Sequence, residues 1–104
     1  MKKRVVITGL GIVAPNGVGL DAFTNAIKNG ISGIKFDAEL ERLKFSCQIS
    51  GTPEILEELK SNYFSDLELR NFNSTGILYG VIAGLDAWKD AGLPIENNEN
   101  PDWE

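Results

Sequence analysis

Residues 4–19 have the sequence Arg-Val-Val-Ile-Thr-Gly-Leu-Gly-Ile-Val-Ala-Pro-Asn-Gly-Val-Gly, and this stretch carries the strongest structural signal in the chain. Val5 to Ile7 are apolar and β-branched on both faces, a pattern typical of a strand covered on both sides in a parallel sheet. Gly9 and Gly11 then allow the backbone to turn or to approach a neighbour closely. The turn residues 15–17, Pro-Asn-Gly, end the apolar run. We therefore predict a central strand, a glycine corner, a short extension and a turn.

The same stretch formally matches a dinucleotide-binding loop, because Gly9-x-Gly11-x-x-Ala14 fits the Rossmann glycine pattern. That mechanism needs a helix that begins inside the motif, so that its N-terminal N–H groups face the pyrophosphate. Here Ile12 and Val13 follow and then a turn, which disfavours a helix start. No strand ending in Asp or Glu follows about 20 residues later, as the motif requires. A nucleotide-binding module stays as a minor alternative, which equilibrium dialysis against NAD and NADP would detect.

A secretory signal is a second alternative, because residues 2–4, Lys-Lys-Arg, precede an apolar run. The run contains Thr8, two glycines and many β-branched residues, and no small-x-small cleavage site precedes Pro15. These features disfavour a signal peptide. The basic cluster is more simply a solvated N-terminus.

Length and composition exclude several classes of protein. The 104 residues allow at most one small domain, and the net charge of −5 argues against nucleic acid as a partner. A single cysteine excludes an internal disulfide, and the lack of histidine removes the usual metal ligand and general base. No apolar run approaches the roughly 20 residues needed to cross a bilayer. We expect no metal, no cofactor and no membrane contact, and a location in a reducing cytoplasm.

The middle of the chain predicts short elements. Leu20, Phe23, Ala26 and Ile27 form one apolar stripe of a helix over 20–29, ended by Gly30 in the left-handed conformation, with a turn at residues 32–33. Residues 37–43 have a weak helical pattern, and residues 45–51 alternate as in a strand with one buried face. Thr52-Pro53-Glu54 predicts the start of a further helix, with Ile55, Leu56 and Leu59 as its buried stripe.

The last predicted element is a helix. A helix can start at Ser65 or Asp66, and residues 76–90 have a clear helical pattern that Gly92 ends. Gly76, Gly80 and Gly84 recur every fourth residue, and each costs about 1 kcal/mol against alanine in a helix interior. We therefore predict that another backbone approaches this face closely. Residues 94–104 are predicted to be a polar loop or tail.

Several blocks together resemble one family. They are Val5-Val6-Ile7-Thr8-Gly9-Leu10-Gly11-Ile12-Val13-Ala14-Pro15, the glycines 17 and 19, Gly30-x-Ser32-Gly33-Ile34, and the stretches 79–87 and 90–93. In this order and spacing they closely resemble the start of β-ketoacyl-acyl carrier protein synthases, the condensing enzymes of the thiolase fold. The resemblance implies an α/β chain with a partial thiolase-like fold, the first two strand-helix units of a sheet covered by helices. Residues 1–93 would then be the N-terminal part of a β-ketoacyl synthase N-terminal domain.

The resemblance also implies a chemistry. Similar synthases carry an acyl group on a cysteine thiolate and condense it with malonyl-acyl carrier protein, which loses carbon dioxide, in fatty acid or polyketide biosynthesis. Histidines and backbone N–H donors assist this step, and in the family these residues lie beyond residue 104. The whole synthase of which this chain would be the N-terminal part is called the parent enzyme below. Its implied partners are acyl carrier protein and acyl thioesters, and it is expected to be a homodimer or heterodimer. The segment itself is expected to be scaffold.

No residue of this chain is predicted to be catalytic, cofactor-binding or metal-binding. We reject Cys47 as a nucleophile, because it lies in a predicted strand, does not align with the family's catalytic cysteine and is most simply a buried small residue. The acidic groups Glu57-Glu58 and Asp37/Glu39/Glu41 are most simply solvated helix faces. We expect the isolated chain to be inactive and to self-associate through an exposed sheet edge.

One departure from the family leaves a rival open. Similar synthases usually carry Met-Asp ahead of the last helix, and this chain has Asn73-Ser74. The parent could therefore be a non-catalytic partner subunit, like the one that sets chain length in polyketide systems. A structural test also follows: a first segment outside any sheet, or a helix starting at Gly11 toward a phosphate, would overturn the family assignment.

Overall fold

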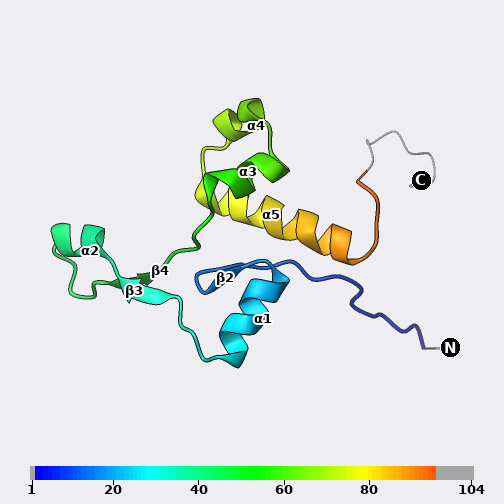
Figure 1. Cartoon of the computed structure of the whole chain (residues 1–104), viewed down its shortest axis with the longest axis horizontal. Helices are drawn as coiled ribbons and strands as arrows, with labels where there is room; N and C mark the ends of the chain where they lie inside the picture. Colours follow the sequence, from blue (N-terminus) through cyan, green and yellow to red (C-terminus); the bar gives the residue numbers. More distant parts are fainter. Residues whose placement is uncertain (1, 96–104) are drawn as a thin grey trace.

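The longest helix, α5, lies at the centre of the fold, with short helices and two small antiparallel strand pairs around it (Figure 1). The computed structural model describes residues 2–95. Its elements are, in chain order, β1 (Val13–Ala14), β2 (Gly17–Val18), α1 (Leu20–Lys28), β3 (Ile34–Phe36), α2 (Ala38–Arg42), β4 (Ile49–Gly51), α3 (Glu57–Tyr63), α4 (Asp66–Asn71) and α5 (Thr75–Asp90).

The N-terminal segment differs from its prediction. Val5, Val6 and Ile7 lie in no strand, and their exposed fractions are 93%, 69% and 84%. In Figure 1 the segment runs away from the rest of the molecule. A strand needs a neighbour for its backbone hydrogen bonds, and the described strands pair only as β1 with β2 and β3 with β4, both antiparallel. The predicted central strand of a parallel sheet is therefore wrong for the described part of the chain.

The predicted turn after the glycine corner is confirmed. β1 and β2 form a hairpin in which Val13 faces Val18 and Ala14 faces Gly17, so residues 15–16 make the turn. The Gly19 N–H donates to the Ile12 carbonyl at 2.9 Å, which closes the hairpin. Helix α1 begins only after this closure, at Leu20. No helix therefore starts at Gly11, as expected.

Helix α1 ends as predicted but buries less than predicted. Gly30 has a φ of 65°, the left-handed conformation that glycine adopts at little cost. The Ile31 N–H donates to the Ala26 carbonyl at 2.8 Å across this end. Ala26 is buried, but Ile27 is 58% exposed, so the predicted apolar stripe is only partly covered by the described residues.

The antiparallel β3–β4 pair, whose strands are connected through α2, was only half predicted. Strand β3 was missed, because three residues following a turn give too short a pattern to recognise, and the predicted strand 45–51 is reduced to β4. Residues 45–48 instead connect α2 to β4, and Lys44 ends α2 with a φ of 57°. Cys47 lies in this connection and is exposed, so its predicted place in a strand and its predicted burial are wrong.

The helices before α5 begin at different signals. Thr52 does not cap a helix; α3 begins at Glu57, after Leu56 in extended conformation. Leu56 is 69% exposed, although Ile55 packs at the core. Ser65 does start α4, through a capping box in which its Oγ accepts from the Glu68 N–H and Glu68 accepts from the Ser65 N–H. This predicted helix start is confirmed.

The described residues contain one small core. Phe64, Leu78 and Ile82 are buried, Ile82 completely, and partly buried neighbours pack on them: Val13, Ile55, Tyr63, Leu69, Phe72 and Val81. The rings of Phe64 and Phe72 meet edge to face, with centroids 4.9 Å apart. The core thus joins β1, α3, α4 and α5, and the antiparallel β3–β4 pair lies outside it.

The exposed surface predicts self-association of the isolated chain. Its accessible area is 8556 Å², whereas a compact monomer of 11.4 kDa exposes about 5,800 Å². Ile34, Phe36, Ile49 and Ile77 are each more than half exposed. We expect sedimentation velocity to show larger species as concentration rises, since apolar surface is removed from water on contact. A compact monomer with a cooperative melt at all concentrations would contradict this.

Candidate functional site

The most constrained place in the structure is the contact between residues 9–13 and helix α5. A Cβ placed on Gly11 would lie 1.8 Å from the Ala83 carbonyl oxygen, and one on Gly9 would lie 2.2 Å from that of Ala87. Only glycine permits this approach of backbone to backbone. The glycines are therefore packing residues, which confirms the prediction that they approach a neighbour closely.

Alternation along the segment continues this contact into the core. Two residues after Gly11, Val13 packs against the buried cluster. The Leu10 N–H donates to Asp90 Oδ2 at 2.9 Å, so the other end of α5 also holds the segment. The opening motif thus lies along α5 over several turns, and its function in the described chain is to position these two elements.

The three glycines of α5 do not make the contact predicted for them. A Cβ on Gly80 or Gly84 would meet nothing within 4 Å, and one on Gly76 would meet only Ser74 Oγ at 3.6 Å. The close backbone approach occurs at Ala83 and Ala87 instead. Within residues 2–95 the predicted occupant of the glycine face is absent, so the prediction named the wrong face.

A polar contact fastens α3 to α5. Tyr63 Oη donates to Asp86 Oδ1 at 2.5 Å, and Lys89 Nζ lies 5.2 Å from the centroid of the Tyr63 ring. Burial, followed by the hydrogen bond to Asp86 and the charge of that carboxylate, raises the pKa of Tyr63 from 10.0 to about 12. The neutral phenol is therefore the form that the folded chain favours.

This shift predicts a loss of stability in alkali. Because the folded chain binds the phenol proton more tightly, the Tyr63 contribution is complete below pH 10 and is lost as the pH rises toward about 12. We expect phenolate absorbance to show a late titration step near pH 12, accompanied by weaker α3–α5 contact. Tyr63→Phe should remove that step, and Asp86→Asn should lower its midpoint. A late step that survives Tyr63→Phe would contradict the assignment.

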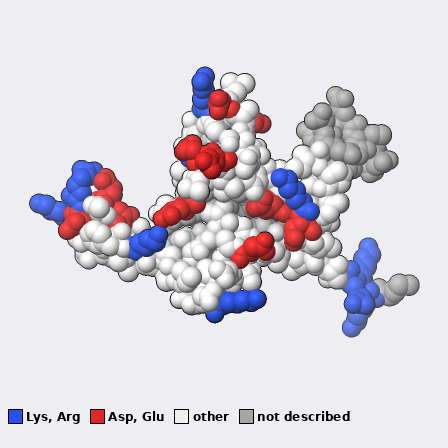
Figure 2. Space-filling model, in the orientation of Figure 1, with Lys and Arg blue, Asp and Glu red and all other residues white. Residues whose placement is uncertain are grey.

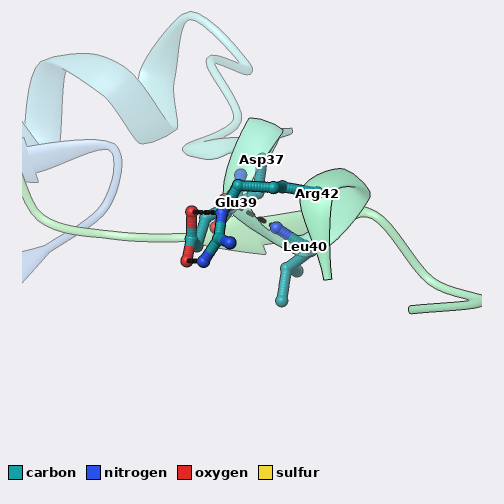
Figure 3. A network of polar contacts seen from close by, with 4 residues as sticks. All are labelled: Asp37, Glu39, Leu40 and Arg42. Carbon is teal, nitrogen blue, oxygen red and sulfur yellow. Dashed lines mark hydrogen bonds and ion pairs between the residues drawn. The ribbon is translucent and has the colours of Figure 1, made fainter. Parts of the chain in front are cut away.

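The acidic residues around α2 have structural roles (Figure 3). Asp37 caps α2 by accepting from the Glu39 and Leu40 N–H groups, and it also accepts from Ser50 Oγ at 2.7 Å. The Ser50 hydroxyl is the main cause that lowers the pKa of Asp37. Glu39 pairs with Arg42, which lowers the pKa of Glu39. Asp37 therefore marks the start of α2. Among residues 2–95, no group of three or more side chains that could hold a metal ion occurs.

A hollow of about 300 Å³ lies at the N-terminus of α5. It is lined by Glu57, Lys60, Leu69, Phe72, Asn73, Ser74, Thr75 and Leu78. Asn73 and Ser74, which depart from the family pattern, therefore line it. Lys60 Nζ already pairs with Glu57 at 2.9 Å, and Glu58 is exposed. Neither cysteine nor histidine is among the residues that line the hollow.

Figure 2 shows how charged side chains are distributed over one face of the described residues. On the face seen in Figure 2, acidic and basic side chains are interspersed, and the basic residues 2–4 lie at the end of the projecting N-terminal segment. Within residues 2–95, no helix has both the length and the apolar character needed to span a bilayer.

Comparison with known proteins decides the family. The sequence profile described as "Beta-ketoacyl synthase, N-terminal domain" matches residues 2–103, almost the whole chain. The chain belongs to this β-ketoacyl synthase family. Membership implies a thiolase-like α/β fold, and the described helices and small sheets are of that mixed class.

Curated members of the family give the same result. The chain is 35% identical over 100 residues to 3-oxoacyl-[acyl-carrier-protein] synthase 1 of Buchnera aphidicola, covering 95% of this chain and 24% of the relative. It is 32% identical over 99 residues to synthase 2 of Vibrio cholerae, covering 95% and 23%. It is 33% identical over 96 residues to the chloroplastic synthase I of Arabidopsis thaliana, covering 88% and 19%. The chain thus spans about a quarter or less of each relative.

Family membership corrects the structural test set from the sequence. Residues 5–7 do lie outside any sheet, which was expected to overturn the family assignment, yet the family model matches residues 2–103, so this expectation was wrong. The test was too strict, because a strand forms only when its hydrogen-bonding neighbours are also present. The second criterion of the test agrees with the family, because no helix begins at Gly11 and α1 begins at Leu20.

Proposed function

We propose that this chain is the N-terminal segment of a 3-oxoacyl-acyl carrier protein synthase. We further propose that residues 1–93 would form the first two strand-helix units of its N-terminal domain once neighbouring strands, which residues 5–7 lack within the described residues, are present. The observation that carries the proposal is the family match along residues 2–103. Residues 94–104 would be a polar loop or tail, mostly outside the described residues. The parent enzyme would work in the cytoplasm, in fatty acid or polyketide biosynthesis.

The proposed reaction of the parent is a decarboxylative Claisen condensation. A cysteine thiolate carries the acyl group as a thioester, and malonyl-acyl carrier protein loses carbon dioxide to give an enolate. The enolate carbon attacks the thioester carbonyl, forms the new carbon–carbon bond and releases the thiolate. The oxyanion that develops needs hydrogen-bond donors in fixed positions. Acyl carrier protein is thus the proposed partner, in a homodimeric or heterodimeric enzyme.

We propose that none of these catalytic groups comes from this chain. Cys47 lies in an exposed connection and not at a helix N-terminus, where the positive end of the helix dipole lowers a thiol pKa. The sequence contains no histidine to act as a base beside it. The segment instead contributes scaffold, above all the packing of residues 9–13 on α5.

The activity of the isolated chain tests one half of this proposal. With acyl and malonyl thioesters of acyl carrier protein, purified chain of the correct mass should release no more carbon dioxide and condensed product than buffer. The full-length Vibrio cholerae synthase serves as the positive control. Turnover by the isolated chain, unchanged by Cys47→Ser, would show that other residues of the chain are catalytic.

A chimera tests the other half. Residues 1–104 of this chain would replace the matching segment of the Vibrio cholerae synthase. If the segment is scaffold, the folded chimera should condense thioesters, and Cys47→Ser in it should leave the rate unchanged. A folded, dimeric chimera without activity would show that the replaced segment supplies more than scaffold.

A non-catalytic partner subunit is the second candidate for the parent, and Asn73-Ser74 favours it. These residues line the hollow at the start of α5, where similar synthases usually carry Met-Asp. Any coding sequence that follows Glu104 distinguishes the two candidates. A cysteine in a small-residue context with two later histidines supports the enzyme, and a substituted cysteine supports the partner subunit.

A further inference from the structure

We draw no further inference here: the strongest candidate, the apolar face of the antiparallel β3–β4 pair, where the side chains of Ile34, Phe36 and Ile49 are each more than half exposed, carries nothing because nothing in the structure shows what covers it.

Discussion

Gly11→Ala is expected to separate the N-terminal segment from α5. The added Cβ would lie 1.8 Å from the Ala83 carbonyl oxygen and 2.7 Å from the Ala87 backbone nitrogen. Both are backbone atoms of a helix, so neither can move aside as a flexible side chain would. Overpacking of this kind costs about 1–3 kcal/mol, and more where the neighbour is rigid. Amide hydrogen exchange should show faster exchange in residues 10–19 and along α5, because local opening becomes easier.

Gly80→Ala is the matched control for that substitution. Like Gly11→Ala, it adds one methyl group. Here the methyl group lies on α5 itself, at a position where it would meet nothing within 4 Å. Alanine is favoured over glycine in a helix interior by about 1 kcal/mol, so exchange in α5 should become slower. Equal loss of protection in both variants would show that α5 is merely intolerant of change and that the glycine contact has no special role.

Ile82→Ala is expected to have the largest effect on the core. Ile82 is the one described side chain that is completely buried, and it lies in the cluster with Phe64 and Leu78. Truncation of a buried isoleucine to alanine costs about 2–5 kcal/mol, through lost burial and the cavity left behind. With so small a core, we expect loss of helical circular dichroism and of exchange protection in α3, α4 and α5 together.

The control for Ile82→Ala lies on the same helix. Ile77→Ala removes the same atoms from a side chain that is 54% exposed. Surface substitutions usually change stability by less than about 0.5 kcal/mol, and alanine has the higher helix propensity. The circular dichroism and the amide hydrogen exchange should therefore stay near those of the unsubstituted chain. A large effect of Ile77→Ala would mean that its exposed face is covered in solution, for example by a second copy.

Local signals in the sequence were read correctly. The turn at Pro15-Asn16, the left-handed Gly30, the end of α5 at Gly92 and a helix start at Ser65 all occur as expected. Each depends on the conformational preference of one or two residues and on hydrogen bonds within a few positions. The long helical pattern of residues 76–90 was also correct, since α5 covers Thr75–Asp90.

Several predictions that depended on distant neighbours failed, although the close approach of Gly9 and Gly11 to a neighbour was correct. Val5 to Ile7 have strand composition but no neighbouring strand among the described residues, and Cys47 is exposed because its connection lies outside the core. Thr52 has the chemistry of a helix cap, yet no helix begins before Glu57. The rejection of Cys47 as a nucleophile used burial and a place in a strand as two of its reasons, and both are wrong; its lack of alignment with the family's catalytic cysteine remains a prediction.

The sequence by itself determined the family and most of the local elements. The order and spacing of glycines and turn residues can be recognised in the sequence without knowing which residues pack together. Only the tertiary structure decided which small residues touch. A Cβ on Gly9 or Gly11 would meet Ala87 or Ala83, whereas one on Gly80 or Gly84 would meet nothing within 4 Å. In the sequence, both pairs are simply glycines at short spacing. Spacing places residues on a face of a helix, but the packing of the whole chain decides which face is covered.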